Sequence, residues 1–168
     1  IDGPGAASLI ISGRDALTVF TIDGGATVAL QDLTIADGFS TSTGGSTVYI
    51  SSGDVTVSGV VFTGNYTPGT GGAIRILNGT LTVMDSDFND NQARDGGAIY
   101  SEATSLIVTN STFTDNLAQF AGGAIYSLSS LTVTDSTFTE NDSYSNGGAI
   151  NLAAAASTNV ISRSTFTN

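Results

Sequence analysis

The four-residue phrase Gly-Gly-Ala-Ile recurs along the chain at an almost constant interval. Its copies occupy residues 71–74, 96–99, 122–125 and 147–150, so the first glycine advances by 25, 26 and 25 residues. A second phrase, Phe-x-x-Asn, keeps the same period at Phe62/Asn65, Phe88/Asn91, Phe113/Asn116 and Phe138/Asn141. A period in this range predicts a solenoid, in which each repeat buries its apolar face only against its neighbours.

Between the two phrases, apolar and polar residues alternate. In one repeat the apolar positions are Ile74/Ile76, then Leu81/Val83, then Phe88. Alternation by two places these side chains on one face of a strand, and the abundant Val, Ile and Thr favour strands. Three short strands in about 25 residues predict an all-β fold, a single-stranded parallel β-helix of six to seven coils.

The repeat extends over the whole chain but is less regular at its start. We expect one domain over residues 1–168, with irregular first coils at 1–43 and regular coils at 44–168, opened by Gly44 and Gly45. In the earlier coils Ile35 takes the phenylalanine position and Gly38 the asparagine position. Because the chain starts abruptly and stops inside a repeat, we interpret it as a piece of a longer protein.

Each phrase has a physical role in such a fold. A Gly-Gly pair lets the backbone turn where a side chain would clash or would require a positive φ. The repeated asparagines are predicted to stack as an amide ladder at a corner, and the repeated phenylalanines to fill the core with stacked rings. The two sets are Asn65, Asn91, Asn116 and Asn141, and Phe62, Phe88, Phe113, Phe138 and Phe166.

One rival solenoid fits part of the pattern. Residues 60–65, Val-Val-Phe-Thr-Gly-Asn, match the core of a leucine-rich repeat, whose period also covers 25 residues. The rest of the unit has strand formers and turns where that fold often places a helix, which favours the β-helix.

The tandem phrases from residue 44 to 168 resemble a known family. They are similar to the repeats of the polymorphic outer membrane proteins, autotransporter adhesins of chlamydiae, and of other large bacterial surface proteins. The resemblance implies a right-handed β-helix, secretion, surface display and adhesion. It leaves the anchoring route open, because this chain lacks the C-terminal membrane barrel of that family.

Charge and composition restrict the partners. The formal net charge is −11, with Arg14, Arg75, Arg94 and Arg163 as the only cationic side chains. Binding to nucleic acid or to an anionic membrane is therefore disfavoured, because both require basic patches. No long apolar run predicts a membrane span. The acidic, lysine-free, Thr/Ser/Asn-rich composition favours an extracellular or cell-surface location.

Catalysis is disfavoured. Polysaccharide lyases and hydrolases share this fold, but their clefts are walled by long loops, whereas here only four or five residues connect each asparagine to the next Gly-Gly. The chain has no His or Lys, so a general base would have to be a carboxylate. The only candidate is Asp95, beside Arg94. We expect no catalytic residues, with polysaccharide binding or cleavage kept as an alternative.

Acidic residues precede the ladder asparagines in successive coils. Asp90, Asp115 and Glu140 should line up on the outside, where carboxylate and carbonyl oxygens can bind Ca²⁺. The alternative is a solvated acidic edge that keeps the stack soluble. A second, weaker candidate column comprises Asp85, Asn110 and Asp135. No other cofactor is expected.

Two further outward columns suggest surface contacts. Tyr49, Arg75, Tyr100 and Tyr126 form one that can stack on sugar rings of a carbohydrate or host-surface ligand, or that simply stiffens the sheet. The other consists of Thr-x-Thr rows flanking Phe113, Phe138 and Phe166, and resembles ice-binding surfaces. It is interrupted at Phe62 and Phe88, so ice binding is a minor alternative.

The repetitive chemistry favours a structural and adhesive surface module, a rigid rod that acts through length and side-chain display. A second hypothesis is head-to-tail self-assembly, since an open β-helix end exposes unpaired strand edges. Such stacking would give a homo-oligomer or a filament.

Overall fold

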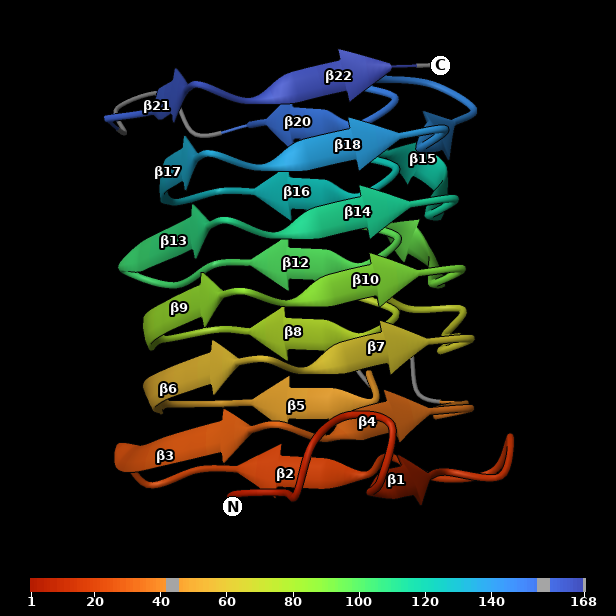
Figure 1. Cartoon of the computed structure of the whole chain (residues 1–168). Coiled ribbons are helices and arrows are strands. Elements are labelled where there is room, and N and C mark those ends of the chain that lie inside the picture. The colour runs from red at the N-terminus through yellow and green to blue at the C-terminus, as the bar shows by residue number, and fades with distance from the viewer. Residues whose placement is uncertain (42–45, 154–157, 168) are drawn as a thin grey trace.

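The chain forms a stack of β-coils with parallel strands throughout (Figure 1). The computed structural model describes residues 1–41, 46–153 and 158–167, and no helix occurs among them. This confirms the all-β parallel solenoid with three main strands per coil and excludes the leucine-rich alternative. Gly44 and Gly45, predicted to open the first regular coil, lie outside the described residues.

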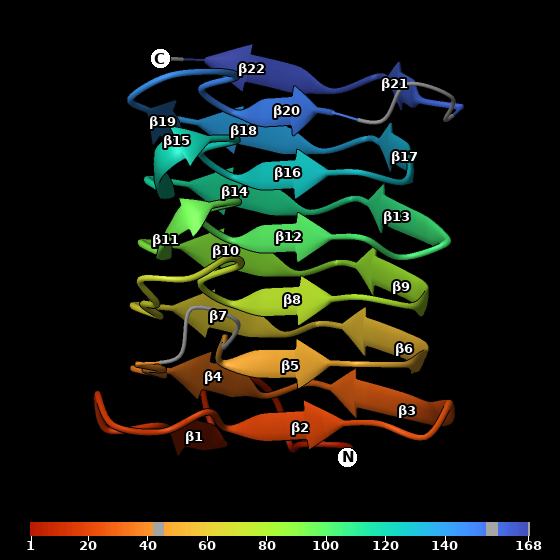
Figure 2. The ribbon, with the colours of Figure 1, turned by 180° about the vertical axis from the view of Figure 1, so that it is seen from behind.

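The first sheet contains the strand that begins at the isoleucine of each Gly-Gly-Ala-Ile phrase and the equivalent strands of the two coils before them. Its six strands pair in parallel from coil to coil, and this sheet faces the viewer in Figure 2. They are β2 (Phe20–Ile22), β5 (Val48–Ile50), β8 (Ile74–Ile76), β12 (Ile99–Ser101), β16 (Ile125–Ser127) and β20 (Ile150–Leu152).

The second sheet contains the middle strand of each coil and is also six-stranded. Leu81, Leu106 and Leu131 point inward from it at equivalent positions and are fully buried. The strands are β3 (Ala26–Gln31), β6 (Gly53–Ser58), β9 (Gly79–Met84), β13 (Ser105–Thr109), β17 (Ser130–Thr134) and β21 (Val160–Ser162).

The third sheet presents the core phenylalanines and has seven strands. Ile35 pairs with Phe62, so the earlier coils follow the predicted register. The strands are β1 (Ile10–Ser12), β4 (Thr34–Ala36), β7 (Val61–Thr63), β10 (Asp87–Asn89), β14 (Thr112–Thr114), β18 (Thr137–Thr139) and β22 (Thr165–Thr167).

A fourth, smaller sheet was not predicted. The connections after the ladder asparagines, interpreted from the sequence as plain loops, pair with each other in three coils: β11 (Gln92–Asp95), β15 (Leu117–Ala121) and β19 (Asp142–Ser143). These segments lack the apolar alternation of the other strands. They form a sheet because the three main sheets stack successive coils one strand spacing apart, which brings the backbones of these segments within hydrogen-bonding distance.

The two glycines of each phrase have different roles. Gly96 has a φ of +62°, which favours glycine, whereas a Cβ on Gly97 would lie 2.0 Å from the carbonyl oxygen of Gly123 in the next coil. The first glycine therefore provides the backbone conformation and the second the space for close stacking, as the sequence predicted.

The core is a continuous column of apolar side chains inside the coils. Its phenylalanine rings stack face to face with centroids 4.7 Å apart, from Phe62 through Phe88, Phe113 and Phe138 to Phe166. Neighbouring ring planes differ by 3–8°. Successive coils therefore lie nearly in register, with little of the twist common in β-sheets.

Candidate functional site

The predicted asparagine ladder is present at the corner that follows the third sheet. Asn65, Asn91 and Asn116 each donate from Nδ2 to Oδ1 of the next asparagine at 2.8–2.9 Å. The ladder begins at Gly38, whose N–H donates to Oδ1 of Asn65, and it ends at Asn141. All four asparagines are buried.

Each amide also satisfies backbone groups. Asn116 Nδ2 donates to the Phe88 carbonyl at 2.9 Å, and its Oδ1 accepts from the Asn91 N–H at 3.1 Å. The asparagine therefore connects the coil below to the coil above, and it saturates polar groups that burial would otherwise leave unsatisfied.

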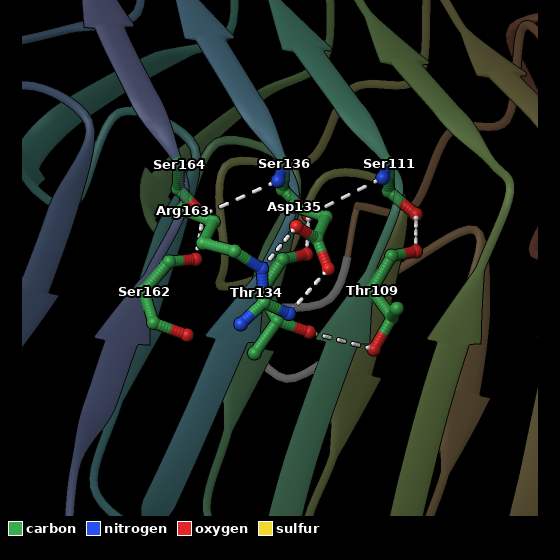
Figure 3. A network of polar contacts seen from close by, with 8 residues as sticks. All are labelled: Thr109, Ser111, Thr134, Asp135, Ser136, Ser162, Arg163 and Ser164. Carbon is green, nitrogen blue, oxygen red and sulfur yellow. Dashed lines mark hydrogen bonds and ion pairs between the residues drawn. The ribbon is translucent and has the colours of Figure 1, made fainter.

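A second ladder, of serines, was missed in the sequence. Ser86, Ser111 and Ser136 each donate their N–H to the hydroxyl oxygen of the next serine at 3.2 Å, and that series ends at Ser164. Each hydroxyl donates to the carbonyl two residues earlier, as Figure 3 shows for Ser111, Ser136 and Ser164. The available signal was a serine two residues before every core phenylalanine except Phe62, hidden by the high content of Ser and Thr.

The predicted acidic column occupies a backbone turn. Asp90, Asp115 and Glu140 have φ values of 52–54°, and Asp37 and Gly64 continue the column with positive φ. Asp tolerates this left-handed conformation better than most residues, which gives the column a conformational role. Within the described ranges, no three acidic or other metal-ligating side chains gather closely enough to share an ion. Calcium binding there stays a prediction.

The second acidic column is internally paired. Asn110 Nδ2 donates to Asp85, and Arg163 binds Asp135 through Nε and Nη2 at 2.6 Å each (Figure 3). Hydrogen bonding to Arg163 lowers the pKa of the exposed Asp135 carboxyl. Asn110 and Arg163 thus relieve the repulsion that an unbroken row of carboxylates would create.

The predicted outer column of the first sheet is also present. Tyr49, Arg75, Tyr100 and Tyr126 pair in register on successive strands. The Arg75 guanidinium lies between the rings of Tyr49 and Tyr100, at 5.8 and 5.7 Å from their centroids, and 3.8 Å from the Glu102 carboxylate. Burial, followed by the nearby Glu102 charge, raises the pKa of Tyr100 to about 12.

These contacts cover both faces of the Tyr100 ring and one face each of Tyr49 and Tyr126, which leaves little ring surface for a sugar. Tyr100 and Tyr126 stack on each other at 5.2 Å with planes 6° apart, and Arg75 covers the other face of Tyr100. The column therefore offers ring edges and hydroxyls outward. This geometry favours the sheet-stiffening role over sugar stacking.

The charge pair considered for catalysis is closed on itself. Arg94 Nε donates to Asp95 Oδ2 at 2.8 Å. The Asp95 side chain is largely shielded, with 15% of its surface exposed. A general base must reach a substrate proton, so this pairing does not favour catalysis.

The family comparison agrees with this geometry. The family model for the right-handed β-helix region matches residues 16–168. The chain belongs to the right-handed β-helix family. No curated protein and no solved structure matches the chain significantly. The family gives the β-helix its handedness and does not identify a substrate or a partner.

The outer threonines of this β-helix form the expected rows. Thr112, Thr137 and Thr165 pair in register, as do Thr114, Thr139 and Thr167. In the next coil toward the N-terminus Asp87 and Asn89 take their places, so the regular part is confined to three coils. Thr112 donates its hydroxyl to Asp87, which ends the threonine row with a charged partner.

The C-terminal coil exposes core residues. Phe166, at the end of the ring stack, has 45% of its surface exposed. An open hollow of about 350 Å³ lies beside it, lined by Phe138, Asn141, Gly148, Ala149, Phe166 and Thr167. Separately, no helix among the described residues is long and apolar enough to cross a lipid bilayer.

Proposed function

We propose that this β-helix is a non-catalytic structural and adhesive module of a bacterial extracellular or cell-surface protein. The observation that carries the proposal is the repeated bonding between coils. The same period governs the ring stack, the asparagine ladder and the serine ladder. The properties that the sequence maintains along its length are therefore stiffness and the regular display of side chains on the surface.

Two further observations support the location and the role. The Gly-Gly-Ala-Ile and Phe-x-x-Asn phrases resemble those of the chlamydial autotransporter adhesins, whose passengers are displayed on the cell surface. The lysine-free, acidic composition is typical of secreted bacterial surface proteins, and a net charge of −11 disfavours nucleic-acid partners.

Bead adhesion tests this proposal. Beads coated with the chain are expected to remain on polysaccharide-coated or cell-coated surfaces under flow, while beads coated with heat-unfolded chain detach. Polysaccharide incubated with the chain should keep its length distribution. Release of reducing ends that is abolished in Asp95→Asn and Arg94→Gln variants would replace the adhesive role with an enzymatic one. Absence of adhesion on every surface would refute the adhesive role.

Head-to-tail self-assembly is the second candidate, and the open C-terminal face favours it. Strands β20, β21 and β22 end the three main sheets, and Leu152, Ile161 and Phe166 are exposed there. The opposite end presents β1 and β2, each parallel to the other strands of its own sheet, and these two strands carry Ile11 and Phe20 packed against the core. Such a contact is heterologous and propagates.

Sedimentation velocity over a range of concentrations tests self-assembly. Growth of the sedimenting species with concentration, reduced in a Phe166→Lys variant, would support it. A single monomeric species at all concentrations would exclude it. Thr139→Lys, on the outer face of the same sheet, serves as the matched charge control.

A further inference from the structure

Two aromatic side chains on neighbouring coils are conspicuously exposed. Tyr144 has 73% of its surface exposed and Phe120 has 56%, whereas the core phenylalanines from Phe62 to Phe138 are fully buried. Both exposed residues belong to the corner occupied by the fourth sheet, on the side of the coil where β15 and β19 lie (Figure 2).

Backbone bonds hold the two segments side by side in the stack, with Tyr144 level with Gln119 and Phe120 one position further along the neighbouring coil. The N–H of Tyr144 donates to the Ala118 carbonyl at 3.3 Å, and the N–H of Asn146 donates to the Phe120 carbonyl at 3.0 Å. These bonds join one coil to the next, so the two rings project from adjacent coils at one corner.

An irregularity in the fourth sheet explains the exposure of Phe120. The register between β11 and β15 shifts between Ala93 and Asp95, and β15 is one residue longer than β11. As a result Gln119 and Phe120 are both exposed, in place of the usual alternation. Bulges of this kind re-aim side chains and occur preferentially beside functional sites.

Several uncharged hydrogen-bonding groups lie at the same corner as the two rings. Gln119, Ser145 and Asn146 are exposed at the same corner. The side chain of Asn146 donates to the hydroxyl of Ser145, the residue after Tyr144, at 3.0 Å. Ring faces combined with a rim of amides and hydroxyls match the two aspects of a sugar ring, its apolar C–H face and its hydroxyl edge.

We propose that the corner formed by Phe120, Tyr144, Gln119 and Asn146 binds a neutral oligosaccharide. The proposal rests on the adhesive function above and gives it a ligand class and a place. A neutral sugar is favoured over an anionic one because the chain carries a net charge of −11, Asp142 is exposed at this corner, and Arg94 in the neighbouring strand β11 is paired with Asp95. A protein partner is disfavoured, since a standard interface needs about 800 Å² on each side and the strands here are two to five residues long.

The test uses calorimetric titration of the chain with cellohexaose, mannohexaose and chitohexaose as neutral probes and hexagalacturonate as the anionic probe. At least one neutral probe is expected to bind. Phe120→Ala and Tyr144→Ala should each weaken that binding about tenfold, a loss in the range of one aromatic contact. Leu128→Ala, an exposed apolar residue outside this corner, should bind as the parent does. Circular dichroism and thermal unfolding verify that each variant remains folded.

Three results would overturn the proposal. They are no binding of any neutral probe at millimolar concentration, unchanged binding in the Phe120→Ala/Tyr144→Ala double variant, and equal or tighter binding of hexagalacturonate. If beads adhere under flow but no neutral probe binds, only this site is refuted. If a neutral probe binds at the corner but beads fail to adhere, the site stands and the adhesive function is refuted.

Discussion

Each interior ladder asparagine stabilises three coils at once. Asn116 accepts from Asn91, donates to Asn141 and caps the Phe88 carbonyl, all away from solvent. An apolar replacement removes every one of these bonds and leaves buried partners without water. Leaving buried polar groups without a partner costs more free energy than the hydrogen bonds contribute to stability when they are formed.

We therefore expect Asn116→Ala to lower the free energy of unfolding by roughly 3 kcal/mol, since several buried polar groups lose their partner. Urea unfolding followed by circular dichroism measures the change. Asn78→Ala, at an exposed asparagine, is the matched control and should stay near the parent value. A loss below about 1 kcal/mol for Asn116→Ala would contradict a stabilising ladder.

Tyr100 should ionise late. Its folded pKa of about 12 lies above the ordinary value of 10.0, because burial and the Glu102 charge disfavour the phenolate. The folded state gains stability from this raised pKa. That contribution is fully present below pH 10 and is lost as the pH rises through 12. In a rapid alkaline pH jump monitored by phenolate absorbance, Tyr100→Phe should remove the latest ionisation step. Tyr144→Phe should retain it, and Glu102→Gln should shift it to lower pH.

At the scale of the strand, alternation was the informative signal. Ile74, Leu81 and Phe88 point inward because only one register of a strand with period-two alternation places its apolar side chains in the narrow core. Each coil has three such strands, so three sheets could be predicted. The fourth sheet could not, because Gln92–Asp95 pairs through backbone groups that any residue carries. Phe120 was missed for a related reason: its orientation depends on a register shift relative to the neighbouring coil.

The serine ladder predicts a position-dependent effect within one coil. Ser111→Ala removes the acceptor of the Ser86 N–H and should cost about 1–2 kcal/mol of unfolding free energy. Ser105→Ala, on the outer face of β13 in the same coil, should cost clearly less. Equal effects of the two changes in urea unfolding would show that the ladder adds nothing.

A calcium titration tests the binding predicted for the acidic column, and the geometry of the described residues favours a null result. Calcium is bound by roughly six to eight oxygen ligands. In the described part of the chain, no three carboxylates lie close enough to bind one ion. The melting temperature in millimolar Ca²⁺ should therefore equal the melting temperature in Mg²⁺ at the same ionic strength. A specific rise with Ca²⁺ that disappears in Asp115→Asn would establish the site.

For the molecule as a whole, stability should vary along the stack. Coils in the middle contact two neighbours, whereas the C-terminal coil contacts one and exposes Phe166 and Ile161. Repeat proteins behave as one-dimensional arrays whose ends open first.

Hydrogen exchange measured by mass spectrometry should show this gradient. Peptides covering β10 and β14 are expected to exchange slowest, and those covering β20 and β22 fastest. Uniform exchange along the chain would indicate a single cooperative unit. Faster exchange in the middle would contradict a stack stabilised by its neighbours.

The repeated interface also bears on how such a chain can evolve. Because Asn91, Asn116 and Asn141 meet their neighbours through equivalent bonds, a duplicated or deleted unit of about 25 residues would join flanking coils that already fit it. Unequal recombination within the gene could thus lengthen or shorten the protein without inventing any contact. Populations of such genes should differ by whole units, and rarely by fractions of one.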